Sequence, residues 1–384
     1  MCAKRRSAAG SGFSLIELMV ALVIGVLVML GITQVMLGSE GQQRTTNATN
    51  DVDQSASYAA YALDKAVRSA GSAFYQANQF TLGCPLYATN GTSQLLPLSG
   101  APSSEFPNVT QTTLVLMPLL ILPGQSAASD GSGGSHTSDV IVVMAGVNGN
   151  AAVPSSFLQA PTATVLHLVS DVGYAAGDLV LLSDVAQGTS LSGCVIDQAS
   201  SVASGGVVNL GGTYHAGDSI SGHAISSISA GGLAIDLGNE TSGSPPQFEL
   251  IGVGPDTTLD AFDLITQQSS PVINDVFEMH ALYGVDPTGN GTIVWDQPTG
   301  NYSPASLTAG TAAAASTIQT IKAVRIGLIL RSQLPEKTAV TPGPLTLFSD
   351  LGSALTYTRS LGSSEQHYRY RTLELTIPLQ NTLQ

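Results

Sequence analysis

Few side chains in this sequence of 384 residues stand at spacings that suggest chemistry. The six histidines are scattered, and none has the partner spacing of a zinc motif. No lysine follows a glycine-rich loop that could cradle phosphate, and no Gly-x-Ser-x-Gly motif presents a nucleophilic serine. His167 and His280 lie inside predicted strands and are interpreted as structural or solvent-facing residues. A catalytic triad is assembled in space and leaves no fixed pattern, but nothing argues for one, so we expect no enzyme and no cofactor.

One loop loosely resembles a calcium site. Asp286, Asn290 and Asp296 provide oxygen side chains at roughly the spacing of a calcium-binding loop. Gln297 stands where such loops carry a bidentate glutamate. The alternative is a hairpin turn in which Asn290-Gly291 supplies the positive φ angle. The turn is the favoured interpretation, and no metal is expected.

The cysteines suggest one disulfide. Of the three, Cys2 lies in a short N-terminal leader, which leaves Cys84 and Cys194 as an even pair. In an oxidising compartment such a pair is expected to be bridged. The bridge would close a loop of about 110 residues and contribute about 4–5 kcal/mol in the chain-entropy model. Two buried free thiols are the alternative.

A single carboxylate, Glu17, lies inside the long apolar run of residues 12–37. From Leu18 to Ile32 there is no charged side chain, and the run reaches the ~20 residues that span a bilayer as a helix. A secretory signal peptide has its small-residue cleavage site after the apolar region, whereas here the small residues precede it. An ionisable group at membrane depth costs on the order of a few kcal/mol and usually has a partner. Glu17 therefore needs an explanation.

The pattern Gly12-Phe13-Ser14-Leu15-Ile16-Glu17 behind a basic leader resembles the signal of type IV prepilins and pseudopilins. The resemblance implies cleavage between Gly12 and Phe13 by a membrane peptidase, which also methylates the new N-terminal Phe13. It further implies that Glu17 pairs with the N-terminal amine of Phe13 of a neighbouring subunit during assembly. The alternative is an ordinary signal anchor that happens to contain a glutamate.

Composition and charge indicate the compartment and exclude one class of partner. Only 10% of residues are charged, Gly is plentiful at 41, and the net charge is −14. Loss of the leader would leave 10 basic and 27 acidic residues, a net charge of −17. Nucleic-acid binding needs clustered Lys and Arg, so we expect no nucleic-acid partner. The basic leader predicts that the N-terminus stays in the cytoplasm and that everything after the helix is translocated.

A second helical stretch is predicted behind the apolar run. Apolar residues from Ala56 to Ala70 recur every three or four positions, the pattern of an amphipathic helix. Asp64 and Arg68 can pair one turn apart on its wet face, and Gly71 is the predicted C-cap. Together the two stretches predict one long helix, half in the membrane and half packed on a globular head.

Strands are predicted over the rest of the chain. An apolar segment at residues 113–122, interrupted by Pro118, is interpreted as a buried strand, and 126–139 as a surface loop. Further predicted strands cover 139–146, 162–170, 177–184 and 193–198, with weaker candidates at 205–212 and 230–238. A hairpin is predicted over 271–295, turning at 287–291, and strict alternation predicts half-buried antiparallel strands within 323–332 and 367–381.

The predicted fold class is therefore α+β: a long N-terminal transmembrane and amphipathic helix packed on a β-rich head of antiparallel sheets. The predicted divisions are a leader (1–12), the transmembrane half of the helix (13–37), its amphipathic half (38–71), an irregular region with a first β-sheet (72–241), and a second antiparallel sheet (242–384).

The order and spacing of several segments resemble the PilW-type minor pilins. The segments are a helix ending Arg68-Ser-Ala-Gly71, the strand at 177–184, a hairpin beginning Tyr283-Gly-Val-Asp286, and the strand VRIGLILRS at 324–332. One departure is Leu379-Gln380-Asn381, where the family pattern is Leu-Arg-Asn.

The resemblance implies a minor pilin that takes part in initiating type IV pilus assembly within a minor-pilin complex, at the pilus tip. The implied partners are other minor pilins, the major pilin, the prepilin peptidase and the inner-membrane assembly platform, with a tip adhesin as a further candidate. The implied location is the bacterial inner membrane, single-pass with a periplasmic head, and then the extracellular pilus. A head of this size fits a capping position better than a repeated shaft position.

Two alternatives come from other classes. A minor pseudopilin of type II secretion, similar to the J component, shares the helix and a two-sheet head, but its head is usually much smaller. A membrane-anchored periplasmic binding protein would be indicated by a failure of cleavage before Phe13.

Overall fold

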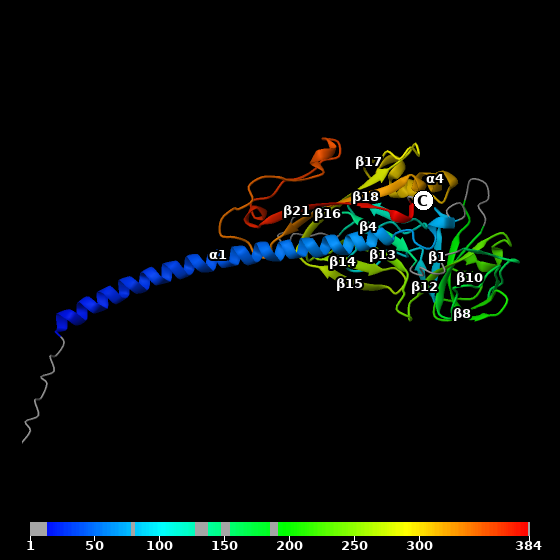
Figure 1. The fold of residues 1–384 in the computed structure, drawn as a ribbon, viewed down its shortest axis with the longest axis horizontal. Coiled ribbons are helices and arrows are strands. Elements are labelled where there is room, and N and C mark those ends of the chain that lie inside the picture. The colour runs from blue at the N-terminus through cyan, green and yellow to red at the C-terminus, as the bar shows by residue number, and fades with distance from the viewer. Residues whose placement is uncertain (1–13, 78–80, 127–136, 147–153, 185–190, 383–384) are drawn as a thin grey trace, which may run out of the picture. The chain divides into compact units, whose positions relative to one another are not determined.

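The computed structural model describes residues 14–77, 81–126, 137–146, 154–184 and 191–382. The chain divides into two compact units, Met1–Asp51 and Val52–Gln384. The described part of the first unit is helical from Leu15 onward, and the strands belong to the second unit (Figure 1). The fold class predicted from sequence, a long helix followed by a β-rich region of antiparallel sheets, is confirmed.

Helix α1 spans Leu15–Ser69 and includes both predicted helical stretches. It is helical through Gly38 and Gly41, although glycine has a low helix propensity. Gly71 follows the helix with a φ of 80°, as predicted for a C-cap, and its N–H donates to the carbonyl of Met144 at 2.8 Å. The chain therefore leaves the helix directly onto a strand of the head.

The part of α1 in the second unit buries one stripe. The residues of this stripe recur every three or four positions and are at most 4% exposed: Val52, Ala56, Ala59, Leu63 and Val67. They join the largest hydrophobic cluster of the described residues. Most of the stripe is alanine or valine, and such small side chains let a helix pack closely on a sheet. The stripe therefore anchors the head to this helix.

One large sheet contains eight strands among the described residues. Its main path runs β2-β1-β8-β7-β12-β5, with β9 pairing both β8 and β6. The strands are β1 (Leu86–Asn90), β2 (Ser93–Leu96), β5 (Ser155–Ser156), β6 (Val165–His167), β7 (Asp178–Ser183), β8 (Cys194–Ala203), β9 (Val207–Leu210) and β12 (Leu233–Asn239). Alternation along β7 sends Leu179 and Leu181 into the main core and Val180 and Leu182 into a second cluster. This sheet is thus covered by apolar side chains on both faces.

The strand order of the second sheet is β15-β14-β13-β4-β3, all antiparallel. Its strands are β3 (Leu119–Leu122), β4 (Val140–Ala145), β13 (Gln247–Val253), β14 (Leu259–Asp263) and β15 (Gln268–Ile273). Strand β3 begins directly after Pro118, which has no N–H to donate to a ladder. The sheet draws strands from both sides of the boundary predicted near residue 242, because β13 pairs with β4.

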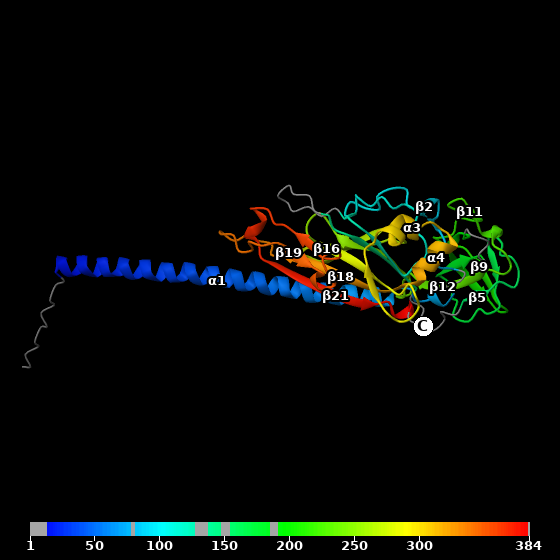
Figure 2. The same cartoon turned by 90° about the horizontal axis from the view of Figure 1, so that it is seen from above.

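A third sheet is formed near the C-terminus in the order β17-β16-β18-β21. Figure 2 labels three of its strands, β16, β18 and β21. Its strands are β16 (Val276–Val285), β17 (Val294–Asp296), β18 (Ile321–Arg331) and β21 (Tyr370–Pro378). The predicted hairpin is confirmed as β16–β17, and the two alternating strands pair with each other as β18–β21. Two short helices, α3 (Pro304–Leu307) and α4 (Ala312–Gln319), connect β17 to β18.

The two faces of this sheet carry different cores. Val324, Ile326 and Leu328 of β18 join the main cluster, as the alternation predicted. On the other face Ile329 joins a third cluster that is covered by the small hairpin of β19 (Leu345–Leu347) and β20 (Tyr357–Arg359). A further small ribbon is formed by β10 (Ser219–Ile220) and β11 (His223–Ala224).

The other strand predictions are confirmed in position, with β4, β6, β7, β8, β9 and β12 lying within or overlapping the expected ranges. Most of the predicted loop at 126–139 lies outside the described residues. The unpredicted elements include strands β1, β2, β5, β13, β14, β19 and β20 and helices α3 and α4.

Candidate functional site

The first turn of α1 is closed by a capping box. The backbone N–H of Ser14 donates to Oε2 of Glu17 at 3.0 Å, and Oγ of Ser14 accepts from the N–H of Ile16 at 3.4 Å. Such a Ser-x-x-Glu pair satisfies amide groups that a helix N-terminus leaves without partners. Glu17 is thus held at the start of the helix and pointed toward its N-terminal end. The same Ser-x-x-Glu signal was present in the sequence, although the role of Ser14 was not predicted.

The apolar residues that follow Glu17 are not covered by any other part of the chain that the structure describes. Leu15–Met36 has a mean hydropathy of 2.8, and by length and composition alone it could cross a membrane. All of its residues are exposed, with Leu22 63% and Val35 73% exposed. A continuous exposed apolar surface of this size usually contacts a membrane or another protein. Gly12 and Phe13, the predicted processing residues, lie outside the described residues.

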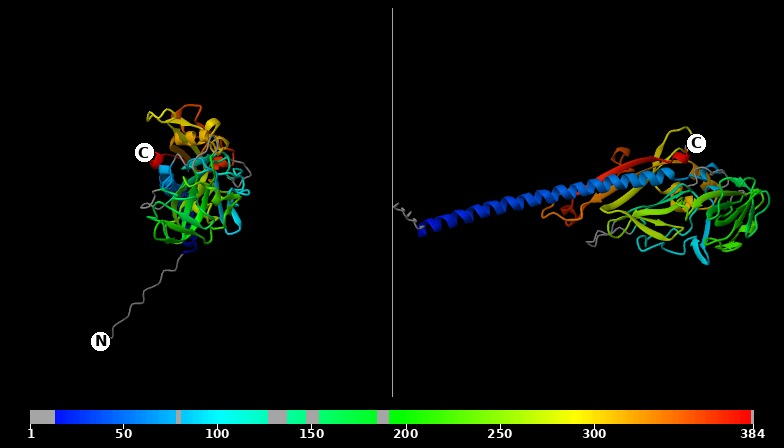
Figure 3. Two further views of the ribbon diagram at one scale, coloured as in Figure 1. Left: turned by 90° about the vertical axis from the view of Figure 1, so that its right-hand side faces the viewer. Right: turned by 60° about the horizontal axis from the view of Figure 1, so that its bottom comes forward.

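The opposite end of α1 is held by the C-terminal segment. The side-chain amide of Asn381 donates to the carbonyls of Ala70 at 2.9 Å and Ser69 at 3.3 Å. Figure 3 shows the red C-terminal segment ending beside this end of the helix. These carbonyls belong to the helix end, where no further helical N–H is available. Asn381 directly follows Gln380, the residue at which the sequence departs from the family pattern. The capping role of Asn381 was not predicted.

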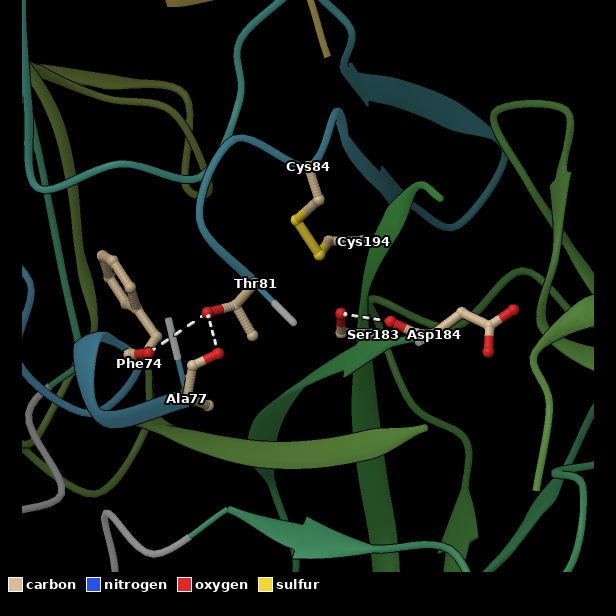
Figure 4. The surroundings of a disulfide bond; sticks show 7 residues. All are labelled: Phe74, Ala77, Thr81, Cys84, Ser183, Asp184 and Cys194. Carbon is tan, nitrogen blue, oxygen red and sulfur yellow. Dashed lines mark hydrogen bonds between the residues drawn. A yellow bond between two sulfur atoms is a disulfide. The ribbon is translucent and has the colours of Figure 1, made fainter. Parts of the chain in front are cut away.

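The predicted disulfide between Cys84 and Cys194 is present (Figure 4). Cys84 lies just before β1, and Cys194 is the first residue of β8, with Cα atoms 5.7 Å apart. These two strands pair in parallel, with Leu86 opposite Cys194. On the Cys84 side, the hydroxyl of Thr81 donates to the carbonyls of Phe74 and Ala77, which ties the cysteine loop to the short 3-10 turn that follows α1 (Figure 4). The bridge therefore fastens two strands that are 110 residues apart.

A buried ionic network lies on the face of β16 that the small hairpin covers. Glu278 is fully buried, and its Oε1 lies 2.9 Å from Nε of Arg359. Arg359 also binds Glu365 at 2.6 Å, and the hydroxyl of Tyr357 donates to Glu278 at 2.9 Å. A buried carboxylate is tolerated only when it is paired in this way. Since Tyr357 and Arg359 belong to β20, the network fixes the hairpin onto the sheet.

His280 belongs to the same network. Its ring nitrogens lie 3.5 Å from Glu278 and 3.7 Å from Asp139. Burial alone would lower the pKa of His280, but hydrogen bonds and charge from the two carboxylates raise the pKa to about 9. The histidine is therefore a structural cation in the core of the head. The sequence predicted either a structural or a solvent-facing residue, and the structure shows the first.

The loop that resembled a calcium site forms a turn. The carboxylate of Asp286 accepts from the N–H groups of Gly291 at 2.7 Å and Asn290 at 3.2 Å. These backbone donors, Gly291 first, lower the pKa of Asp286. Asn290 and Asp296 each accept a backbone N–H from a residue nearby in the chain. Asp286 and Asn290 thus accept backbone donors of the turn, whereas Asp296 in β17 accepts from its neighbour Gln297.

The remaining histidines are separate from one another in the described part of the chain. His215 lies 3.0 Å from Asp197, whose pKa burial raises to about 6. His223 stacks on Tyr87, and His367 contacts the backbone of Glu336. Among the residues described, no three His, Cys, Asp or Glu side chains are grouped so that they could hold a metal ion. His136 lies outside these residues.

Comparison with known families identifies both ends of the chain. Residues 9–33 match the model of the prokaryotic N-terminal methylation motif, which contains Glu17 and most of the exposed apolar surface. Residues 258–381 match the model of type IV pilus-assembly protein W, which contains the third sheet, the ionic network and Asn381. No curated protein and no solved structure matches the chain. Residues 258–381 thus match the PilW family model, and residues 9–33 of the same chain match the prokaryotic N-terminal methylation motif.

Proposed function

We propose that this protein is a minor pilin that helps to initiate type IV pilus assembly as part of a minor-pilin complex at the pilus tip. The observation that carries the proposal is the exposed apolar surface of Leu15–Met36, with Glu17 in its first turn, on a chain that ends in a PilW region. Such a surface needs lipid before assembly and the helices of other subunits afterwards. We infer a single-pass location in the inner membrane with a periplasmic head.

Processing would place a new charge close to Glu17. Cleavage between Gly12 and Phe13 would create an amine on Phe13, beside Ser14, whose N–H already donates to Glu17. Oε2 of Glu17 accepts this hydrogen bond, whereas Oε1 of the same carboxylate has no donor among the described residues. Oε1 can therefore accept a hydrogen bond from the amine of a neighbouring subunit. In hydrocarbon an unpaired carboxylate costs about 2.5–3.5 kcal/mol on insertion scales. Pairing between subunits would remove that cost only when the helices pack in register.

The tip position is supported by the size of the head. The second unit, Val52–Gln384, holds three main sheets, and the described residues at its surface include many loops between them. A bulky head can be placed once at an end of a filament more easily than it can be repeated along a helical shaft. The proposed partners are the other minor pilins, the major pilin, the prepilin peptidase and the assembly platform, with a tip adhesin as a further candidate.

The test combines a gene deletion with two single-residue variants. We expect the deletion to remove surface pili, and the wild-type protein to be present in sheared filaments at trace level. Glu17→Ala should still be cleaved and methylated, as measured by mass spectrometry of the N-terminal peptide, but should be absent from sheared filaments. Asp64→Ala removes the same charge from a half-buried position on the same helix, where Asp64 pairs with Arg68, and should assemble normally.

Three results would contradict the proposal in different ways. Unchanged pili after deletion, with loss of exported enzymes, would indicate a secretion pseudopilin instead. Normal incorporation of Glu17→Ala would refute the role of the carboxylate. A wild-type protein that keeps its leader would indicate an anchored periplasmic binding protein.

A further inference from the structure

The chain between β18 and β21 covers one face of the third sheet. These two strands pair antiparallel up to Arg331 and Tyr370, so a tight turn could have joined them. Residues 332–369 instead carry the small hairpin of β19 and β20, which lies on the face that holds the third cluster. We call residues 345–359 the lid. The proposed function depends neither on the lid nor on the surface beneath it.

The surface beneath the lid lacks a side chain at Gly327. This glycine of β18 lies between His280 of β16 and Glu374 of β21 in the strand register. The ring of Phe348 in the lid is 1% exposed and lies directly over it. A Cβ atom on Gly327 would lie only 2.8 Å from Cζ of this ring. The lid is therefore seated on the sheet by Phe348, for which only a glycine at position 327 leaves room.

Phe348 reaches this position with a strained backbone. Its φ of 60° and ψ of 29° lie in the left-handed region, where a bulky side chain is a conformational outlier. Its N–H donates to Oε1 of Glu374 at 2.8 Å, which holds the residue in place. Such strain persists only where the surrounding contacts outweigh it. Since opening of the lid would release the strain, the closed state is less stable than its contacts alone would make it.

An exposed ion pair holds the same part of the lid. Arg325 of β18 donates to Asp350 at 2.7 and 2.9 Å and to Glu374 at 2.6 Å. The side chain of Asp350 is 59% exposed. Ion pairs in contact with solvent are weak and are screened by salt. The pair of Arg325 with Asp350 therefore adds little stability to the closed lid and makes the closed state sensitive to salt.

The lid buries few apolar side chains of its own. Of its residues, all of which the structure describes, Leu347 and Phe348 are the only apolar ones that are buried. Its hairpin has three residue pairs, and a two-stranded ribbon of this size is at best marginally stable alone. The segments that flank the lid are tied together, because the N–H groups of Val340 and Thr341 both donate to the carbonyl of Gln366. A unit of this kind can open locally while its base stays closed.

The face beneath the lid combines apolar side chains with one carboxylate. Phe277 and Ile329 belong to the third cluster. Glu278 accepts a hydrogen bond from Tyr357 and pairs with Arg359 at the far end of the lid. When the lid opens, water can replace these partners of Glu278, so opening leaves no buried charge without a partner.

We propose that the lid opens as a unit on a closed base, while the rest of the head stays folded, and that opening exposes Phe277, Ile329 and Glu278. The closed lid thus keeps an apolar surface of the head covered. Its stability is set by the seat of Phe348 against Gly327 and, to a smaller extent, by the exposed ion pair.

The experiment follows the lid by two signals in the full-length protein in detergent micelles. Hydrogen exchange measured by mass spectrometry reports opening of residues 345–359. Acrylamide quenching reports solvent access to Trp295, the single tryptophan, which packs against the cluster under the lid. In the wild type we expect the lid amides to exchange at least about 10-fold faster than those of β18.

Salt tests the exposed ion pair. We expect about 1 M NaCl to raise exchange in the lid of the wild type by about 2–5-fold, because it screens Asp350 from Arg325. Asp350→Asn should raise exchange by a similar factor at low salt and should abolish the salt effect. Arg325 keeps Glu374 as a partner in this variant, so the sheet itself should be unaffected.

Gly327→Ala tests the seat of Phe348. The added Cβ collides with the ring, so exchange in the lid and quenching of Trp295 should both rise, exchange by at least about 10-fold, while β4 and β7 stay protected. Gly343→Ala is the matched control, because a Cβ added there meets no atom within 4 Å beyond its chain neighbours. The control should behave as the wild type does.

Four results would overturn the proposal. The lid does not open by itself if its amides in the wild type exchange no faster than those of β18. Unchanged exchange in Gly327→Ala would show that Phe348 does not seat the lid, and a salt effect that persists in Asp350→Asn would remove the role of the ion pair. Phe348→Gly removes the ring without adding an atom to the sheet. If it loosens β4 and β7 as much as the lid, the lid is not a separate unit.

Discussion

Leu15–Met36 and residues 52–69 belong to the same helix, yet their apolar side chains are placed differently. In the first stretch apolar residues surround the helix, and all of them are exposed. In the second they form one stripe that is buried against the sheets of the head. The difference shows that the head buries the apolar side chains of the second stretch with residues of this same chain. The first stretch is not covered by the described part of the chain, and under the proposed function lipid or other subunits cover it.

The largest test of this comparison places a new carboxylate in each stretch. Ala59→Asp would bury an unpaired charge at a position that is 0% exposed, which costs about 3–5 kcal/mol or more and should unfold the head. Val28→Asp lies in the exposed apolar stretch and should leave the head folded while reducing membrane insertion and incorporation into pili. Limited proteolysis of the head in detergent measures the first effect, and membrane fractionation measures the second. A folded head in Ala59→Asp would contradict the packing described here.

A smaller effect is expected from leucine truncation. Leu63 is 1% exposed in the main core, so Leu63→Ala should lower the free energy of unfolding of the head by about 2–5 kcal/mol. Leu22→Ala removes the same atoms from a side chain that is 63% exposed and should leave this free energy unchanged. Denaturant unfolding of both variants in the same detergent checks the contrast. Equal losses in the two variants would mean that the apolar stretch also stabilises the head.

The smallest effect is expected at the end of the helix. Asn381→Ala removes the donors to the carbonyls of Ser69 and Ala70, so the head should lose about 0.5–1.5 kcal/mol of stability. The neighbouring Gln380→Ala serves as the control, since Gln380 is exposed. Thermal denaturation of the two variants resolves the difference. If both melt at the wild-type temperature, the cap does not hold the helix.

Periodic segments explain why much of this fold could be predicted. The buried stripe from Ala56 to Val67 repeats every three or four residues, as in a helix, and apolar residues of β18 repeat every second residue, as in a strand. Both patterns could therefore be recognised in the sequence. The third sheet could be anticipated from such strands. Its pairing of β16 with β18 required knowledge of three-dimensional contacts.

The missed elements lack that local signal. β13 follows Pro245-Pro246, which marked a break between sheets, and its partner β4 lies about 100 residues earlier in the chain. Helix α4 is a run of alanines too short for a clear period. Pairing between distant strands depends on the whole fold and is not encoded in any window of residues.

The candidate site divides in the same way. Glu17 and its leader could be recognised because the signal is contiguous. The Cys84–Cys194 disulfide could be predicted because these are the two cysteines that remain outside the leader. The role of Asn381 could not be anticipated, because it depends on which backbone carbonyls lie nearby in space.

The disulfide also has a mechanical consequence. Under the proposed function the head is carried on a filament, where it can come under tension. Because Cys84 and Cys194 join neighbouring parallel strands, a force applied across the pair passes through the bridge, and the segment between them carries no tension. Those 110 residues would otherwise extend by roughly 360–400 Å once their strands detached. The bridge therefore limits how far the head can lengthen under load.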